Sequence, residues 1–341
     1  MLKSLILLIC VGVSYCQSTT QCSFKIREAE FSKYCVLTGS RLYVGDFDGN
    51  KYDDLMCHNT ETGDVSIFFS TVPIFRKNLW SGPKTCRGAK YVVLGDFNGD
   101  YRTDLLCQYP TGEKYIYFAT KMGTFPSTYV TVKAKTSSTP SIQIWCTQSG
   151  YRPVVGDFDG DGTDDYLCYD GTSGFMWVIY GQSTTWGTFR PEYTFKETFK
   201  CRGEVLTAQF NGDLKTNLVC YSKGDGKIKI ASFDETQVKV IYDSTLKCTG
   251  DHIRVMLADV DGDRYDDFFC KLPGKIPLVF RNTRNGNFYE PVEIDFQPKV
   301  EKDKSFRTLE VGDFNGDGKS DVMCHGFDGS LQLAESFCLR M

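Results

Sequence analysis

A segment of thirteen residues recurs six times along the 341-residue chain, and this repetition constrains the fold more than any other feature. Each copy begins with glycine or alanine, continues as an acidic loop and ends in a cysteine. The copies occupy residues 45–57, 95–107, 156–168, 208–220, 258–270 and 312–324, at intervals of 50 to 61 residues. Such an interval predicts one supersecondary unit per copy and a core built by stacking the units.

Each repeat is expected to contain strands only. In the second repeat, apolar residues fill 91–94 before the acidic loop, and a second strand begins at 104–107. A turn at 110–112 precedes an alternating segment at 115–118, and 129–132 can supply a fourth strand. No stretch of the chain shows helical periodicity over twelve residues.

Four short strands per repeat predict an all-β fold: a single β-propeller of six four-stranded blades, with a degenerate seventh blade left open. We expect the propeller to span residues 17–341. A strand near residues 24–26 is expected to complete the blade that the C-terminal repeat builds. That pairing would close the ring and remove a free sheet edge.

The acidic loops have the pattern of a calcium site. They are loop 1 (46–54), loop 2 (96–104), loop 3 (157–165), loop 4 (209–217), loop 5 (259–267) and loop 6 (313–321). Oxygen-bearing side chains stand at positions 1, 3, 5 and 9, glycine stands at position 4, and the position 7 carbonyl can face inward. Calcium binds six to eight such oxygens, and carboxylates this close repel one another without a cation. A water-solvated turn rich in Asp, Asn and Gly is the alternative.

Five loops carry the expected ligand set. The side chains at positions 1, 3, 5 and 9 are Asp46, Asp48, Asn50 and Asp54 in loop 1; Asp96, Asn98, Asp100 and Asp104 in loop 2; Asp157, Asp159, Asp161 and Asp165 in loop 3; Asp259, Asp261, Asp263 and Asp267 in loop 5; and Asp313, Asn315, Asp317 and Asp321 in loop 6. The position 7 carbonyls in these loops belong to Tyr52, Arg102, Thr163, Tyr265 and Lys319.

Loop 4 differs from the other five. Its residues at the ligand positions are Gln209, Asn211, Asp213 and Asn217, so it has a single carboxylate where the others have three or four. One carboxylate is a poor replacement for the water that calcium loses on binding. We therefore expect loop 4 to fold without metal and the chain to bind about five calcium ions.

The Asp-x-Asp-Gly-Asp-x-x-x-Asp loop inside a strand-rich repeat resembles the FG-GAP, or VCBS, repeat of integrin α-subunit propellers and certain secreted lectins. The resemblance covers nearly all of residues 17–341. It implies a structural calcium ion in the first interstrand loop of each blade, all on one face, with other ligands bound on the opposite face or between blades. The chain departs from the integrin pattern because it lacks the Phe-Gly…Gly-Ala-Pro segments and carries repeated cysteines.

The N-terminus has the layout of a secretory signal peptide. Lys3 precedes an apolar run at 5–13, and Ser14 and Cys16 occupy the positions before a cleavage site, which predicts a signal peptide over residues 1–16. A buried N-terminal strand is the alternative. No later run of eighteen apolar residues occurs, so we expect a secreted, extracellular protein without a membrane span. Basic residues form no stripe, which argues against nucleic acid as a partner.

Thirteen of the fifteen cysteines follow residue 16, and an oxidising compartment is expected to pair most of them. Five repeats have a second cysteine 19 to 22 residues upstream of the terminal one. This spacing favours one bridge per blade: 35–57, 86–107, 146–168, 201–220 and 248–270. A rival scheme joins each terminal cysteine to the next repeat, as in 57–86. Cys22, Cys324 and Cys338 do not follow the pattern.

Candidates for a ligand site stand near the upstream cysteines, in segments expected to emerge opposite the calcium loops. They are Trp80, Trp145, Arg87 and Arg202. Exposed tryptophan can stack on sugars or aromatic ligands, although Trp80 and Trp145 could instead pack between blades. No nucleophile elbow, His-Glu-x-x-His motif or phosphate loop occurs. His58 and His325, at matching places in neighbouring blades, are the catalytic candidates, with two structural surface histidines as the simpler explanation.

These features favour a calcium-stabilised extracellular binding module, lectin-like or adhesive, whose partner is a glycan or a protein. The alternative is a secreted enzyme on the propeller scaffold, such as a cofactor-independent oxidoreductase of the marine-worm luciferase type. That association rests on size and cysteine content, without a shared motif. A structural role in a matrix is the third possibility.

Overall fold

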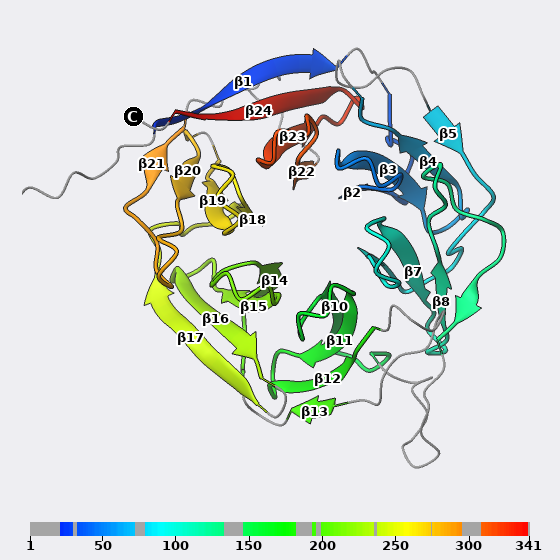
Figure 1. The fold of residues 1–341 in the computed structure, drawn as a ribbon, viewed down its shortest axis with the longest axis horizontal. Coiled ribbons are helices and arrows are strands. Elements are labelled where there is room, and N and C mark those ends of the chain that lie inside the picture. Colours follow the sequence, from blue (N-terminus) through cyan, green and yellow to red (C-terminus); the bar gives the residue numbers. More distant parts are fainter. Residues whose placement is uncertain are drawn as a thin grey trace, which may run out of the picture.

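The computed structural model describes residues 21–29, 33–71, 79–132, 146–181, 193–195, 199–234, 237–273, 275–294 and 308–339 (Figure 1). The predicted signal peptide and Trp145 lie outside these ranges. Six four-stranded sheets surround a central opening, which confirms the all-β prediction and fixes the blade number at six. The described residues include no helix long and apolar enough to cross a membrane.

Each of the first five blades is built from four consecutive strands, ordered from the centre of the ring outward. In chain order the strands of these blades are β2 (Ser40–Gly45), β3 (Asp54–Asn59), β4 (Val65–Phe68) and β5 (Leu79–Ser81); β6 (Tyr91–Gly95), β7 (Asp104–Gln108), β8 (Lys114–Tyr117) and β9 (Val130–Thr131); β10 (Tyr151–Gly156), β11 (Asp165–Asp170), β12 (Phe175–Ile179) and β13 (Tyr193–Phe195); β14 (Glu204–Ala208), β15 (Asn217–Tyr221), β16 (Lys227–Phe233) and β17 (Val238–Thr245); and β18 (Arg254–Ala258), β19 (Asp267–Lys271), β20 (Leu278–Phe280) and β21 (Val292–Glu293).

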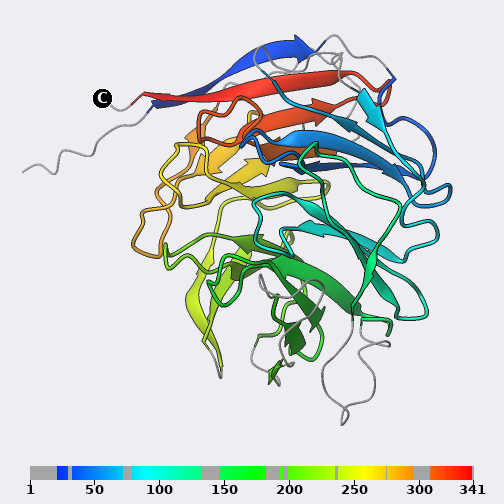
Figure 2. The same ribbon diagram turned by 45° about the vertical axis from the view of Figure 1, so that its right-hand side comes forward.

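The sixth blade joins the two ends of the chain. It contains β22 (Thr308–Gly312), β23 (Asp321–His325) and β24 (Leu331–Leu339), and its outermost strand is the N-terminal β1 (Gln21–Ala29). The antiparallel register pairs Ala29 with Leu331 at one end and places Cys22 opposite Cys338 near the other. Figure 2 shows the two long strands running together along one side of the ring. The predicted closure by the strand at 24–26 is confirmed.

The core lies between neighbouring blades, and the acidic loops are anchored in it. The second residue of every loop is apolar and buried: Phe47, Phe97, Phe158, Phe210, Val260 and Phe314. In the cluster between blades 3 and 4, for example, Phe158 meets Phe233 with ring centroids 4.6 Å apart. Each loop is thus a polar hairpin whose second side chain is fixed by hydrophobic burial.

Five disulfides confirm the pairing within blades: Cys35–Cys57, Cys86–Cys107, Cys146–Cys168, Cys201–Cys220 and Cys248–Cys270. Their Cα–Cα distances are 5.3–6.1 Å. The upstream cysteine lies before the inner strand, so the chain must turn sharply to reach its partner. Three upstream cysteines adopt a left-handed backbone, with φ of 55°, 50° and 57° at Cys35, Cys86 and Cys146. Cys324 of blade 6 is free and buried.

Candidate metal sites

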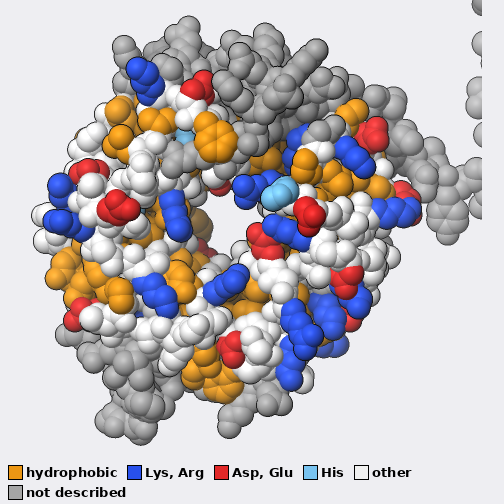
Figure 3. Space-filling model, turned by 180° about the vertical axis from the view of Figure 1, so that it is seen from behind, with side chains coloured by type: hydrophobic (Ala, Val, Ile, Leu, Met, Phe, Trp, Pro, Cys, Tyr) orange, Lys and Arg blue, Asp and Glu red, His pale blue; other side chains and the backbone are white. Residues whose placement is uncertain are grey.

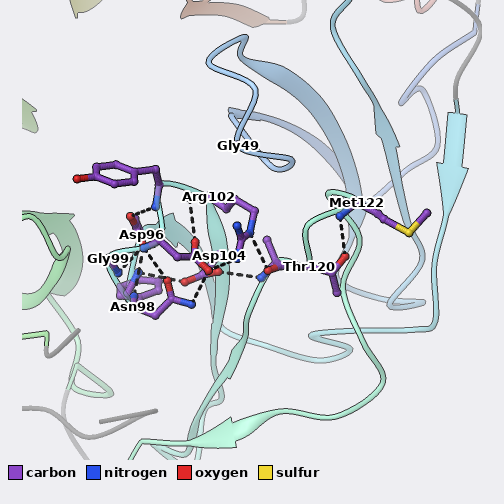
Figure 4. Close-up of polar contacts among 12 residues, drawn as sticks. Gly49, Asp96, Asn98, Gly99, Arg102, Asp104, Thr120 and Met122 are labelled. Carbon is purple, nitrogen blue, oxygen red and sulfur yellow. Dashed lines mark hydrogen bonds and ion pairs between the residues drawn. The ribbon is translucent and has the colours of Figure 1, made fainter. Parts of the chain in front are cut away.

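The first aspartate of each acidic loop organises the loop backbone. In loop 2, Asp96 Oδ1 accepts hydrogen bonds from the backbone N–H groups of Gly99 and Asp100, at 2.8 and 3.1 Å, and Oδ2 accepts from Tyr101 at 2.7 Å (Figure 4). Loops 1, 3, 5 and 6 repeat this arrangement. Position 4 is glycine because the backbone there has φ of 71–81°, which side chains with a Cβ rarely adopt.

The ninth residue brings a carboxylate into the base of the loop. One oxygen of Asp54 accepts from Phe47 N at 3.1 Å, and the other accepts from Ser70 N at 2.7 Å. The five aspartates at this position are almost fully buried, and their burial together with the neighbouring carboxylates raises the pKa: to about 8 in Asp54, about 9 in Asp267, about 8 in Asp321, and well above the usual value in Asp104 and Asp165. A nearby cation would favour the ionised form of these groups.

The donor chemistry fits a hard cation such as calcium in several loops. Three aspartate clusters place carboxylate oxygens within 4.8 Å of one another and could hold a metal ion: Asp46, Asp48 and Asp54; Asp157, Asp159 and Asp165; and Asp259, Asp261 and Asp263. Two carboxylate oxygens of the expected ligands, Asp261 Oδ1 and Asp321 Oδ2, are buried without a hydrogen-bond partner. A buried acceptor without a donor is costly, and a bound cation would satisfy it.

Basic side chains also reach into some of the loops. In loop 5, Arg281 Nη1 lies 3.4 Å from Asp261 Oδ2, and Arg284 Nε lies 2.6 Å from Asp263 Oδ2. In loop 2, Arg102 pairs with Asp100 and also donates to the carbonyl of Ala119 (Figure 4). In loop 6, Lys319 Nζ lies 3.0 Å from Asp317. Within the described residues, loop 1 shows no such ion pair.

Loop 4 has a different internal chemistry. Gln209 stands where the organising aspartate stands elsewhere. The amide of Asn217 accepts from Phe210 N at 2.8 Å, as the position 9 aspartates do, but its Nδ2 is buried without an acceptor. An N–H donor at this position would repel a cation, which agrees with the prediction that loop 4 folds without metal.

A ring of hydrogen bonds between blades passes through the loops, and sequence reasoning missed it. The backbone N–H at position 8 of each loop donates to the carbonyl at position 1 of the preceding blade, at 2.6–2.8 Å. The six bonds are Asp53–Asp313, Thr103–Asp46, Asp164–Asp96, Thr216–Asp157, Asp266–Gln209 and Ser320–Asp259.

The residues at position 8 show an alternation that could have revealed this ring. Aspartate stands there in blades 1, 3 and 5, and threonine or serine in blades 2, 4 and 6. Each aspartate carboxylate accepts a second bond from the position 1 N–H of the preceding blade, at 2.7–2.8 Å, in Asp53, Asp164 and Asp266. Four inner strands end in glycine because a Cβ there would collide with the position 8 side chain of the next blade, as Gly156 would with Thr216. Each loop is therefore bonded through its backbone to the loop of the next blade.

The two histidine candidates are buried and bonded to backbone carbonyls, so the expectation that they lie at the surface is wrong. His58 Nε2 lies 3.0 Å from Thr85 O, and His325 Nε2 lies 2.9 Å from Tyr34 O. In both cases the carbonyl belongs to the residue before the upstream cysteine of the next blade. At the same strand position, Tyr169 donates to Phe199 O at 2.8 Å, and Tyr221 donates to Cys248 O. The histidines thus share a place in the fold with two tyrosines that tie a blade to the next connector.

The ligand candidates are dispersed. Trp80 belongs to the outermost strand β5, not to a connector as expected, and its ring meets Phe125 of blade 2 at 6.4 Å between centroids. This placement matches the alternative in which Trp80 packs between blades. Arg87 is exposed and donates to Glu61 O at 3.3 Å, and Arg202 is exposed. Trp145 lies outside the described residues.

A ring of six sheets, each with an acidic hairpin loop after its inner strand, defines a six-bladed β-propeller with candidate metal sites. The model of the FG-GAP-like repeat matches residues 96–168 and 259–324, and each match runs from one acidic loop to the terminal cysteine of the next repeat. The chain is therefore a β-propeller that is similar to the FG-GAP-like repeat over these two segments, as its loops suggested. No curated protein matches it in sequence.

Solved structures share the fold at low sequence identity. A lectin of Agrocybe aegerita, described as recognising non-reducing terminal N-acetylglucosamine, matches with a TM-score of 0.59 and 15% identity, over 89% of this chain and 85% of the lectin. The Tc holotoxin pore of Photorhabdus luminescens matches with a TM-score of 0.63 and 16% identity. That match covers 94% of this chain but only 14% of the toxin chain. Both likenesses concern the fold.

Proposed function

We propose that the chain is a secreted, calcium-stabilised β-propeller that acts as an extracellular binding module with a glycan as its ligand. The observation that carries the proposal is a division of tasks along each inner strand. One end enters an acidic loop that can hold a cation and is bonded to the next blade. The other end carries side chains that differ from blade to blade and are therefore suited to recognition.

The cation would be calcium, with about five ions per chain. All expected ligands are oxygens, and sites made only of carboxylate, amide and carbonyl oxygens suit calcium or magnesium rather than zinc or copper. Loops 1, 2, 3, 5 and 6 would hold one ion each through the side chains at positions 1, 3, 5 and 9 and the carbonyl at position 7. In this role calcium would stabilise the ring and its ordered loops.

An extracellular setting follows from the cysteines. The five disulfides indicate an oxidising compartment, because cytosolic thiols are kept reduced. Export would then depend on the predicted signal peptide at 1–16. Extracellular calcium-binding modules typically have dissociation constants of about 10⁻⁴–10⁻³ M, which suits loops with exposed outer residues.

The ligand class has support from the fold alone. The Agrocybe aegerita lectin has the same fold over most of both chains, and its ligand is a sugar. At 15% identity this supports glycan binding as the first hypothesis to test without assigning residues. The buried, carbonyl-bonded positions of His58 and His325 give catalysis no comparable support.

A glycan array and a turnover screen on the same secreted protein test the proposal. We expect binding to one glycan class, abolished by EDTA and restored by calcium, with no turnover of small-molecule substrates and no light emission. A silent array accompanied by turnover would replace the binding module with an enzyme. Silence in both assays would indicate a protein partner or a matrix role.

A further inference from the structure

Three arginines occupy one structural position in alternate blades. Arg41, Arg152 and Arg254 each stand four residues before the glycine or alanine that ends the inner strand, in blades 1, 3 and 5. The strand registers confirm the equivalence, since each arginine pairs with the residue that follows the terminal cysteine of its repeat: His58, Tyr169 and Lys271. All three therefore lie at the end of the inner strands opposite the acidic loops.

The charges of these arginines are open to solvent. All three side chains are exposed, and none forms an ion pair with another described residue. The matching residues in blades 2, 4 and 6 are Tyr91, Glu204 and Thr308, so only one carries a negative charge. Glu204 is itself paired with Lys223 at 2.7 Å.

Further cations surround the same opening. Lys90 precedes Tyr91, lies 5.0 Å from the centre of its ring and donates to the carbonyl of Thr147. Lys271 is the strand partner of Arg254. Seen from the side opposite Figure 1, Lys and Arg side chains border the central opening at several points (Figure 3). Besides Glu204, a second acid, Glu310, stands on β22 two residues after Thr308. Burial raises the pKa of Glu310 to about 7, and Arg254 acts in the opposite direction. The opening at this face, which we call the arginine mouth, thus has a positive rim.

We propose that the arginine mouth binds the negatively charged group of an anionic glycan, a carboxylated or sulfated sugar. This inference rests on the proposed glycan-binding function and specifies its ligand class and site. Guanidinium groups form charge-assisted, bidentate hydrogen bonds with carboxylate and sulfate-type oxygens. Three of them at the same end of alternate inner strands suit a compact anionic group rather than the continuous backbone of a nucleic acid, which needs a basic track.

The test compares four probes with two variants of the full-length secreted protein in calcium. The probes are sialyllactose, a heparin-derived hexasaccharide, lactose and a single-stranded DNA oligonucleotide. The first variant is Arg41→Gln/Arg152→Gln/Arg254→Gln. The control, Lys227→Gln/Lys239→Gln/Lys247→Gln, removes the same charge from exposed sites in blade 4 and the connector that follows it. Melting temperature and calcium content verify that both variants are folded.

We expect the wild type to bind at least one of the two anionic sugars at least tenfold more tightly than lactose or DNA, with an affinity that falls as salt is raised. The arginine variant should lose at least tenfold of that affinity, and the control should lose less than threefold. Equal losses in the two variants, or DNA binding as tight as that of the sugars, would overturn the inference. Binding of neutral glycans alone would leave the glycan-binding function standing and refute the arginine mouth. No glycan binding at all would refute both.

Discussion

Loops 1 and 5 each contain an aspartate cluster that could hold a metal ion, but their surroundings differ. In loop 1, Asp46, Asp48 and Asp54 form no ion pair with another described residue, whereas in loop 5 Arg281 and Arg284 pair with two of the expected ligands. Asp263 and Asp261 are only 4% and 13% exposed in these pairs, so the attraction is weakly screened. Counting carboxylates at the ligand positions ranks loop 5, with four, above loop 1, with three. The comparison teaches that basic side chains from the rest of the blade decide how much free energy a loop gains by binding a metal ion.

Removal of calcium is expected to have the largest effect, and to separate the two loops. A site held at a hundredfold excess over its dissociation constant adds about 2.7 kcal/mol to the free energy of unfolding. Loss of several sites should therefore lower the melting temperature by more than ~10 °C. Calorimetry in calcium and in EDTA measures this, with metal loss verified by elemental analysis. In stepwise chelation loop 5 should lose its ion before loop 1. An unchanged melting curve after verified metal loss would refute calcium stabilisation.

Replacement of Asp165 by asparagine should convert loop 3 into a loop of the loop 4 type. The amide can accept from Phe158 N, as Asn217 accepts from Phe210 N, but it presents a donor to the cation. We expect one calcium ion fewer per chain. In calcium-containing buffer the free energy of unfolding should fall by about 2–3 kcal/mol. In EDTA the variant should be at least as stable as the wild type, because a buried carboxylate has been removed. Destabilisation of the same size in both buffers would show that Asp165 acts through hydrogen bonds alone.

Removal of the two arginines should leave loop 5, like loop 1, without a basic partner. In Arg281→Gln/Arg284→Gln the carboxylates lose their internal cations, and calcium should bind loop 5 about tenfold more tightly, equivalent to about 1.4 kcal/mol. Isothermal titration with calcium measures the change. Arg264→Gln is the matched control, since Arg264 is exposed in the same loop and forms no ion pair with a described residue. Unchanged or weaker binding in the double variant would show that the arginines support the site rather than compete for it.

Loop 4 offers the reverse experiment. The triple variant Gln209→Asp/Asn211→Asp/Asn217→Asp restores four carboxylates at the ligand positions, and loop 4 already has the hydrogen bond between blades from Asp266 N to Gln209 O. We expect the calcium content to rise by one ion per chain. In calcium-containing buffer the free energy of unfolding should rise by about 1–2 kcal/mol. Asn217→Asp alone is the control and should not add an ion. A wild-type protein that already binds six ions would contradict the comparison of loop 4 with its neighbours.

Blade 6, which closes the ring by joining the two chain ends, differs from the other blades in its cysteines, and here we expect the smallest effect. Its loop resembles the others, but its terminal cysteine, Cys324, is free. The register of β1 and β24 places Cys22 opposite Cys338, so we expect these two to form a sixth disulfide that joins the chain ends. Peptide mapping without reduction should recover a linked Cys22–Cys338 pair and a Cys324 thiol that reacts only after unfolding. Free thiols at Cys22 and Cys338 would contradict it.

Much of this fold could be predicted because the repeat is local. The acidic loop and the terminal cysteine lie within thirteen residues, so their spacing indicated strands, hairpins and at least six blades, and only the closed ring excluded a seventh blade. The near-constant cysteine spacing likewise favoured the pairing within blades. These features depend on the short-range geometry of turns and strands, which residues such as Gly160 and Phe158 impose by themselves.

The tertiary structure decided what depends on residues from different blades. Arg281 and Arg284 follow loop 5 by fourteen and seventeen residues, and their contacts with its carboxylates arise only when β20 pairs with β19. The arginines at 41, 152 and 254 look scattered in the chain and become one charged rim only when the ring closes. The sequence by itself determined the repeated unit and its ligand atoms. Electrostatic interactions act through space, so the charge around each site was settled by how the blades are arranged.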